Sequence, residues 1–489
     1  MPLVLGVDSS TQSTKVEVRD ADDGALVASG RAPHPPVTPP RCEQDPDAWW
    51  RALRAAVAAT GVRRVDAMAV AGQQHGLVVL DAAGAIVRPA KLWNDTESAP
   101  DADWLVGRLE RGAAGWADAV GSVPVASFTI TKLSWLHRCE PGAWARLARV
   151  LLPHDWLTLR LCGELVTDRG DASGTGYWSP AEDRYRYDLL AVVDPDRDWS
   201  TVVPRVLGPT DVAGRLGADA ADALGLGAGA LVAAGTGDNM AAALGLALRP
   251  GDVAVSVGTS GTVFTVSDRP TADPTGAVAG FADATGRFLP LVCTLNAAGV
   301  TDAFARLLGT DPAGLDALAL AAPAGAGGVV LVPHLAGERT PNRPDATGTL
   351  AGLRADVTRE QVARAAYEGV VCGLLDGLDA LGAAGVGGVG GGGRVLLIGG
   401  GGRSPAYQRV LADLAGCAVT VPEPGEHVAT GACVQAAAAL VGTDPVVVAT
   451  AWGLGEGTVV NPTPGVDAAA VRDTFRAASV RAAGAHTPV

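Results

Sequence analysis

The chain has 489 residues, which is too long for one compact core and predicts about two to four domains. Hydrophobic residues make up 48% of it and charged residues 18%, so an intrinsically disordered chain is excluded. The formal net charge is −14, and no cluster of Lys or Arg interrupts it. Binding to nucleic acid or to an anionic membrane surface is therefore not expected.

Cysteine usage and hydropathy indicate a cytoplasmic protein. The seven cysteines are scattered and none forms a C-x-x-C pair, so neither a disulfide framework nor a zinc site is predicted. Asp8 follows too few apolar residues for a signal peptide. No apolar run approaches the ~18 residues of a membrane span.

The chain opens with a hairpin that carries a polar loop. Leu3–Val7 and Lys15–Arg19 are predicted strands, and Asp8–Thr14 between them is a run of small polar residues. The elements predicted next are a strand at Ala25–Ser29, a helix at Pro46–Ala59 and a strand at Val65–Val70.

A similar hairpin begins near residue 253. Strands are predicted at Val253–Val257 and Thr262–Val266, with the tight polar loop Gly258–Gly261 between them. Two such units about half the chain apart indicate a duplicated architecture. The secondary-structure breakers Pro250 and Gly251, after Arg249, predict a domain boundary that gives two domains, residues 1–247 and 248–489.

Two segments late in the chain carry no predicted function. Gly382–Gly393 is mostly Gly and is interpreted as a connector between a helix at Gln361–Leu381 and a strand at Arg394–Ile398. The Ala-rich tail after about Gly465 is expected to hold a helix at Ala468–Ala478, and we assign it no role.

Both polar loops suit the binding of an anion. In the segment from Asp8 to Lys15, small residues let backbone amides approach a phosphate, and Asp8 can hold Mg²⁺. Taken alone, this segment is equally compatible with an ordinary hairpin turn. The loop Gly258-Thr259-Ser260-Gly261 has the same character, and the pairing of the two loops favours a polyphosphate ligand.

Two further motifs follow predicted strands. In Gly235-Thr236-Gly237-Asp238-Asn239, the acidic side chain would lie at the carboxyl edge of a sheet, where ligands bind. On that segment alone a helix N-cap is the better interpretation of Asp238 or Asn239. Four glycines, Gly399–Gly402, follow the strand at Val395–Ile398 and permit close approach by a flat ligand.

Polar arrays typical of sugar recognition occur at Gln73-Gln74-His75-Gly76 and Trp93-Asn94-Asp95, each just after an apolar strand. They offer partners for hydroxyl groups and a ring for stacking. His154 and His427 are interpreted as structural residues.

With these segments in order, the chain resembles the FGGY family of carbohydrate kinases over about residues 3–442. The segments that carry the resemblance are Cys42-Glu43-Gln44-Asp45-Pro46 before Trp49-Trp50, Gly72–Gly76, Leu92–Asp95, Leu151–Asp155 and Gly337–Pro341. Within the family it is most similar to members that phosphorylate D-xylulose.

The resemblance implies an α/β fold of two actin-like (ribonuclease-H-like) domains, with ATP and sugar meeting in a cleft between them. The N-terminal domain would carry the sugar site and the first phosphate loop, and the C-terminal domain the second phosphate loop and the adenosine site. Asp238 would act as the general base toward the sugar hydroxyl, and Asp8 would lie near Mg²⁺, directly or through water.

The resemblance also implies roles for the other motif residues. The first phosphate loop would be lined by Thr11, Ser13, Thr14 and Lys15. The second would present Gly258, Thr259 and Ser260, and the adenosine would lie by Gly400, Gly401 and Arg403. Sugar contacts would come from Gln74, His75, Trp93, Asn94, Asp95, Asp238 and Asn239.

Two departures bear on the substrate. Ser10 stands where many members have Gly, and Gln74 where some D-xylulose kinases have Met.

The expected reaction is phosphorylation of D-xylulose by ATP; ribulose, glycerol or another polyol is the alternative within the family. A nucleotide-switched binding or filament protein on the same scaffold is the alternative from another class. A sensor without kinase activity is disfavoured because Asp8 and Asp238 are present. The sequence does not fix the oligomeric state, and a homodimer is one assembly it allows.

Overall fold

The computed structural model describes residues 2–387 and 392–484 and divides into two compact units. Unit 1 comprises Met1–Ala247, Asp268–Leu289 and Pro424–Gly455; unit 2 comprises the rest of the chain. The sequence predicts a single cut after residue 247. The structure instead assigns two later segments to unit 1, because they pack against its helix α7 and its central strands β1 and β5.

Unit 1 is built on a mixed sheet whose strand order is β13-β14-β5-β1-β2-β3, with β15 continuing beside β5. The strands β1, β5, β14 and β15 are parallel to their neighbours in this set. Their carboxyl ends therefore meet at one edge of the sheet. The bounds are β1 Leu3–Ser9, β2 Ser13–Asp20, β3 Leu26–Pro33, β5 Ala67–Gly72, β13 Val212–Arg215, β14 Leu231–Ala233 and β15 Thr236–Gly237.

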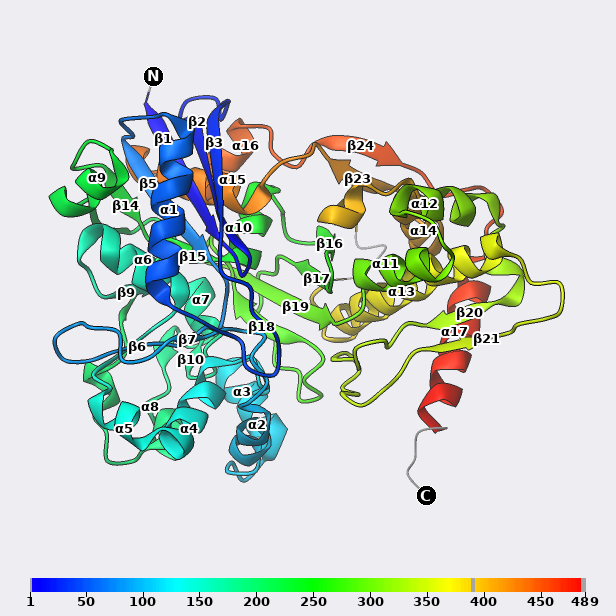
Figure 1. The fold of residues 1–489 in the computed structure, drawn as a ribbon, viewed down its shortest axis with the longest axis horizontal. Coiled ribbons are helices and arrows are strands. Elements are labelled where there is room, and N and C mark those ends of the chain that lie inside the picture. The colour runs from blue at the N-terminus through cyan, green and yellow to red at the C-terminus, as the bar shows by residue number, and fades with distance from the viewer. Residues whose placement is uncertain (1, 388–391, 485–489) are drawn as a thin grey trace. The chain divides into compact units, whose positions relative to one another are not determined.

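Helix α1 (Pro46–Thr60) covers one face of this sheet. The Asp45 side chain caps it by accepting from the Asp47 amide, and the chain leaves it at Gly61 in the left-handed conformation. Figure 1 shows α1 lying along β1, β2 and β3. The predicted helix ended at Ala59, one residue earlier than the observed one.

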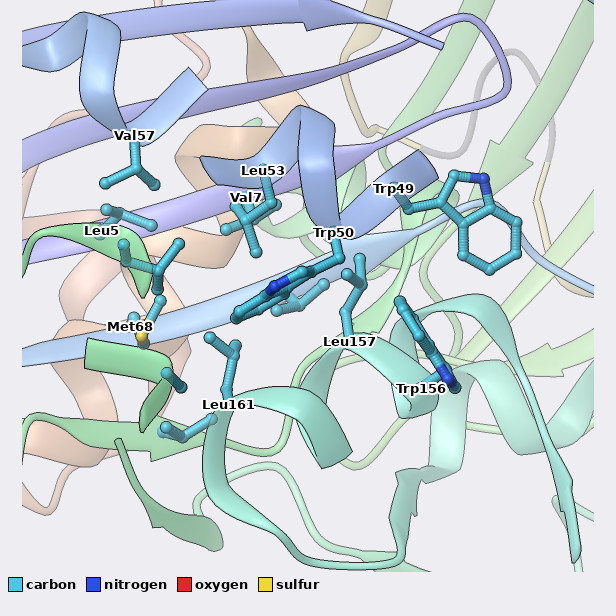
Figure 2. Packing of buried hydrophobic residues seen from close by; sticks show 14 of the residues in the cluster. Leu5, Val7, Trp49, Trp50, Leu53, Val57, Met68, Trp156, Leu157 and Leu161 are labelled. Atoms are coloured by element: carbon cyan, nitrogen blue, oxygen red, sulfur yellow. The ribbon is translucent and has the colours of Figure 1, made fainter. Parts of the chain in front are cut away.

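The core under α1 is rich in tryptophan. Figure 2 shows Trp50 and Leu53 of α1 turned toward β1 and β5, beside α6 (Pro153–Cys162). Trp49 meets Trp156 of α6 edge to face, with 6.1 Å between ring centroids. Each of these four side chains is buried, so α1 and α6 are fixed on the sheet by apolar area rather than by surface charge.

The other face of the sheet is covered by α15 (His427–Val441), which also packs on α10 (Asp238–Gly245). A methyl group on Gly245 would overlap the carbonyl oxygen of His427, and one on Gly431 would overlap that of Ala241. The two helices therefore touch backbone to backbone, and only glycine fits at these positions.

No single helix in the described chain is long and apolar enough to cross a membrane. The bent pair of α15 and α16 (Pro445–Ala451) passes that test jointly, by length and composition alone. The residues from Ala429 to Ala438 in α15 are buried within unit 1.

The remaining elements of unit 1 surround the sheet. They are β4 Glu43–Gln44, β6 Val78–Leu80, β7 Ala90–Lys91, α2 Ala99–Val106, α3 Gly112–Val120, α4 Thr129–Cys139, α5 Pro141–Arg146, β8 Arg149–Leu151, β9 Val166–Asp168, α7 Arg169–Ser173, β10 Trp178–Ser179, β11 Arg184–Tyr185, α8 Tyr187–Val193, a 3₁₀ turn at Trp199–Thr201, β12 Arg205–Leu207, α9 Ala218–Leu224 and β18 Ala279–Ala282.

Unit 2 repeats the central plan of unit 1. Its sheet has the order β19-β17-β16-β22-β23-β24, and β16 pairs antiparallel with β17 and parallel with β22, as β1 does with β2 and β5. The predicted duplication is thus present in the strand pairing. The bounds are β16 Val253–Val257, β17 Gly261–Thr265, β19 Phe288–Thr294, β22 Val395–Ile398, β23 Val419–Pro422 and β24 Gly457–Val460. Two further strands, β20 Val330–Val332 and β21 Thr349–Ala351, pair with each other in a separate sheet.

Helices flank the second sheet, and two of them are longer than predicted. Helix α17 runs from Ala468 to Gly484, and its Arg472 and Arg476 pair with Asp376 and Asp379 of α13. Helix α13 itself extends into the predicted glycine connector, of which residues 388–391 lie outside the described chain. The helical bounds are α11 Ala298–Leu307, α12 Pro312–Ala321, α13 Arg359–Ala383 and α14 Pro405–Ala415, with 3₁₀ turns at Ala326–Gly328 and Gly400–Arg403.

Candidate active site

The parallel strands of unit 1 bring the predicted catalytic groups to one edge of the sheet. Ser9 is in register with Gly72, and Gly72 is in register with Gly237. The residues next to these positions are Asp8, Gln73 and Asp238. Side chains separated by more than 150 residues in sequence therefore share one site because the strands that carry them are neighbours.

Asp238 is the first residue of α10, and Gly237 occupies the N-cap position. The interpretation of Asp238 or Asn239 as the N-cap of this helix, which the segment alone favoured, is therefore wrong. Asp238 Oδ1 accepts from the Asn239 amide at 2.8 Å and from Asn239 Nδ2 at 3.0 Å. Asn239 Nδ2 also donates to Gln74 Oε1 at 2.9 Å, which ties the acid to the predicted sugar side.

The environment of Asp238 makes it a stronger base than an ordinary aspartate. Burial raises the pKa of its carboxyl to about 7, and the nearby negative charge of Asp8 adds to the increase. A carboxylate with this pKa can accept a proton near neutral pH, as a general base must.

Asp8 lies at the end of β1 and is 3% exposed. Its Oδ1 accepts from the Ser10 hydroxyl at 2.9 Å, and its Oδ2 lies 3.3 Å from Lys15 Nζ. Burial raises the pKa of Asp8, although Lys15 and Ser10 oppose that increase. Ser10, where many relatives have Gly, thus holds the carboxylate in place.

Glu426 is a charged member of this site that the sequence did not reveal. Its Oε2 accepts from Lys15 Nζ at 2.6 Å, so Lys15 is held between Glu426 and Asp8. Burial lowers the pKa of Lys15, but these two carboxylates outweigh it and the net change is upward. Glu426 is 411 positions from Lys15 and follows no motif, so only the packing of α15 could show it.

The other predicted phosphate-loop residues divide into two kinds. Thr11 is partly exposed, and its hydroxyl donates to Gln73 Oε1 and accepts from Trp93 Nε1, so it joins the loop to the sugar side. Ser13 and Thr14 are buried in β2, and the Thr14 hydroxyl pairs with His34 Nε2 at 2.8 Å. Side-chain contact of Thr14 with a phosphate would require that hydrogen bond to break.

The ring of His75 is held rigidly on the sugar side. Its Nδ1 donates to the Gly174 carbonyl at 2.7 Å, which leaves Nε2 as the acceptor in the neutral ring. The ring also packs against Phe128 and Phe281, with centroids 5.0 and 5.5 Å away. A side chain on Gly174 would overlap the imidazole, so glycine is needed there.

Two side-chain amides of the predicted sugar-binding motifs have buried polar atoms without hydrogen-bond partners in the described chain. They are Gln74 Nε2, a donor, and Asn94 Oδ1, an acceptor. Buried polar atoms in folded proteins are normally satisfied, so each of these atoms is available to a ligand that carries hydroxyl groups. Trp93 stands beside them, partly exposed, with its indole nitrogen bound to Thr11.

Asp95 has a different environment from its neighbours in the Trp93-Asn94-Asp95 motif. It is 0% exposed, and its carboxylate accepts from Lys91 Nζ, the Cys42 amide and the Glu97 amide. It anchors the loop that presents Trp93 and Asn94. Direct contact with a sugar would require this buried set to rearrange.

Among the residues that the structure describes, two groups of three acidic or histidine ligand atoms have the spacing of a metal site. One is Glu43, Asp95 and Glu97, whose centre is already filled by Lys91 Nζ at 2.5–3.2 Å. The other is a buried group around His154. Asp8 belongs to neither, so a cation at Asp8 would take further ligands from phosphate and water.

Unit 2 places the other two glycine-containing motifs at one edge of its own sheet. Ser256 of β16 is in register with Ile398 of β22, and the loops Gly258–Ser260 and Gly399–Arg403 follow these strands. Side chains on Gly399 and Gly401 would overlap Val257, whereas Gly400 faces open space. Gly400, Thr259 and Arg403 are exposed and accessible to a nucleotide.

Comparison with known proteins agrees with this geometry. Residues 3–245 match the N-terminal domain, and residues 253–440 the C-terminal domain, of the FGGY family of carbohydrate kinases. The chain belongs to the FGGY family of carbohydrate kinases. Its fold is accordingly a pair of actin-like α/β domains, as the sequence predicted, and the enzyme is a carbohydrate kinase.

The relatives of this FGGY kinase include proteins of closely similar length. A xylulose kinase of Streptomyces coelicolor is 49% identical over 464 residues, which are 94% of this chain and 92% of that protein. The crystal structure of a xylulose kinase from Bifidobacterium adolescentis is 43% identical, with a TM-score of 0.85 over 98% of this chain and 99% of that one. A Plasmodium falciparum glycerol kinase, at 17% identity and a TM-score of 0.87, shares the fold.

Proposed function

We propose that this kinase transfers the γ-phosphoryl group of ATP to the 5-hydroxyl of D-xylulose, giving D-xylulose 5-phosphate and ADP. The observation that carries the proposal is Asp238, a carboxylate with a pKa near 7, joined through Asn239 to the sugar-side Gln74. The names of the Streptomyces coelicolor and Bifidobacterium adolescentis relatives support the choice of D-xylulose.

In the proposed reaction the sugar oxygen attacks the γ-phosphorus while the bond from that phosphorus to the ADP oxygen breaks. The hydroxyl proton passes to Asp238, so charge and atoms balance. The transition state is loose, and the residues act mainly by alignment. His75 and Gln74 would orient the sugar, because their ring and amide are fixed by Gly174 and Asn239.

ATP and Mg²⁺ are the proposed cofactors. Lys15 and the first loop would bind the phosphates in unit 1, while Thr259, Ser260, Gly400, Gly401 and Arg403 of unit 2 would bind phosphates and adenosine. Mg²⁺ would neutralise phosphate charge, and Asp8 would hold it, directly or through water, because its carboxylate oxygens are of the ligand type that Mg²⁺ prefers and lie at a strand end. A cytoplasmic location and a homodimer remain predictions.

A substrate panel tests the proposed function. ADP release is measured with MgATP and D-xylulose, D-ribulose, glycerol or gluconate, and kcat/KM is expected to be at least tenfold higher for D-xylulose. An equal or higher value for another substrate would replace D-xylulose. ATP hydrolysis at the same rate with and without any sugar would favour the nucleotide-switched binding protein instead.

The pH dependence of kcat/KM for the sugar should report Asp238. Because the base is active only when ionised, kcat/KM is expected to be constant above its pKa and to fall tenfold per unit below about pH 7. The measurement is initial rate at low sugar and saturating MgATP from pH 5.5 to 9. A kcat/KM that stays constant down to pH 5.5, as an aspartate with its ordinary pKa near 4 would give, would contradict the raised pKa.

A further inference from the structure

A buried charge cluster lies directly behind the proposed base. His154, in the first turn of α6, is 0% exposed and faces three carboxylates. Its Nδ1 lies 2.8 Å from Asp171 Oδ2 and 3.3 Å from Asp155 Oδ1, and its Nε2 lies 3.9 Å from Asp168 Oδ1. The three acids come from α6, β9 and α7, so one imidazole joins three elements.

This arrangement favours a positive charge on His154, whose Nδ1 donates to Asp171 Oδ2 at 2.8 Å while its Nε2 has no hydrogen-bond partner in the described chain. Asp168 accepts from the Gly170 and Asp171 amides and the Thr236 hydroxyl, bonds that stabilise its ionised form. Within residues 2–387 and 392–484, the ion pairs of these three acids are all with His154. Buried carboxylates without a cation are strongly destabilising, because their charge is removed from water and left unpaired.

The pKa values agree with this charge. Burial opposes protonation of His154, but Asp155, Asp171 and Asp168 outweigh it and raise the pKa of His154 to about 10. Burial also raises the pKa of Asp155 to about 7 and that of Asp171 to about 6.

The cluster around His154 is connected to the segment that carries Asp238 and to the carbonyl group that holds His75, both in unit 1. Asp168 holds the Thr236 hydroxyl at 2.7 Å, two residues before Asp238. Asp171 lies in α7, which leads into Gly174, whose carbonyl fixes His75. His154 lies close to the backbone at both Gly72 and Gly235: a side chain on Gly235 would overlap its imidazole, and one on Gly72 would overlap its Cβ and main chain.

We infer that His154 is a positioning residue: a buried imidazolium that binds the carboxylates of Asp155, Asp168 and Asp171 and thereby holds His75 and Asp238 in their working positions. The inference deepens the proposed function and rests on it for the roles of His75 and Asp238. The sequence alone predicted only a structural histidine here.

The charge of His154 can be measured without reference to activity. In the intact enzyme labelled with ¹⁵N-histidine, the His154 resonances are identified by their loss in His154→Gln. Both ring nitrogens are expected to stay protonated from pH 6 to 9. A neutral ring at pH 8 would overturn the inference, as would stoichiometric divalent metal in the EDTA-dialysed protein, because His154, Asp155 and Asp171 also have the spacing of metal ligands. The outcome holds whichever sugar is the substrate.

The positioning role is tested by His154→Gln, with His334→Gln as the matched control, since His334 is also buried but lies in unit 2. His154→Gln is expected to lower kcat/KM for the sugar at least 30-fold. It should also move the acid limb upward by about 0.5–1 pH unit, since the negative charge of Asp171, which interacts with Asp238, would no longer be balanced by His154. The charged groups that face Asp238 are Asp8 of β1 and Asp171 of α7, and Asn239 bonds it from α10.

The double variant His154→Gln/Asp171→Asn removes one charge of each sign and replaces the ion pair by two amides. It is expected to recover at least fivefold of the lost kcat/KM and to return the acid limb toward its original position. A folded His154→Gln enzyme with unchanged kcat/KM and acid limb would overturn the positioning role. If the single variant does not fold, a folded double variant with wild-type kinetics supports the charge requirement, and failure of both to fold shows a purely structural role and overturns it.

Discussion

Asp238→Asn is expected to lower kcat by roughly 10²–10⁴-fold, the usual contribution of a general base. The amide is isosteric, so its Oδ1 can still accept from the Asn239 amide and the fold of α10 is kept. Dissociation constants for ADP and D-xylulose, measured by calorimetry, should change less than threefold, because the lost interaction belongs to the transition state.

The matched control is Asp222→Asn, an exposed aspartate of α9 in the same unit. It should keep wild-type kcat and the same acid limb. Asp238→Asn should also lose the limb near pH 7. Near-native turnover in the Asp238 variant would remove this residue from the base role and leave proton transfer to another group.

Gly431→Ala is expected to destabilise unit 1 by roughly 2–3 kcal/mol, the upper part of the range for overpacking. Its added methyl would overlap the carbonyl oxygen of Ala241 in α10, which is backbone and cannot rotate away. Helices α10 and α15 would have to separate, and α10 begins with Asp238. Thermal unfolding should show a Tm lower by about 3–5 °C.

Gly373→Ala provides a control with the opposite sign. Gly373 lies inside helix α13, and a methyl group there meets nothing within 4 Å. Replacing a helical Gly by Ala removes backbone freedom from the unfolded chain and should raise stability by about 0.5–1 kcal/mol. A Gly431→Ala protein with unchanged Tm would show that the contact between α10 and α15 relaxes easily.

Most strands and helices could be predicted because their signals are local. The strand Val253–Val257 occurs as predicted, and α1 differs by one residue at its end. The ends of α13 and α17 differ from the prediction, and the ion pairs that join the two helices link residues almost 100 positions apart. The alanine-rich sequence of α17 does not indicate which distant residues will form ion pairs with it.

The candidate site was predictable in its motif residues but not in its connections. Asp8, Gln74, His75 and Asp238 follow strands, and the resemblance to a kinase family supplied their expected roles. The burial of Asp95 and the hydrogen bond between Thr14 and His34 were not visible, because alternation along a strand does not say what meets each side chain.

The amino-acid sequence by itself determined the fold family, the duplication of a hairpin with a polar loop, and the residue proposed as the base. These depend on short runs of residues whose spacing carries the chemistry. The tertiary structure alone decided the electrostatics: Glu426 beside Lys15, Asp8 near enough to raise the pKa of Asp238, and His154 among three acids. Coulomb energy depends on distance and burial, and both are set only when distant segments pack together.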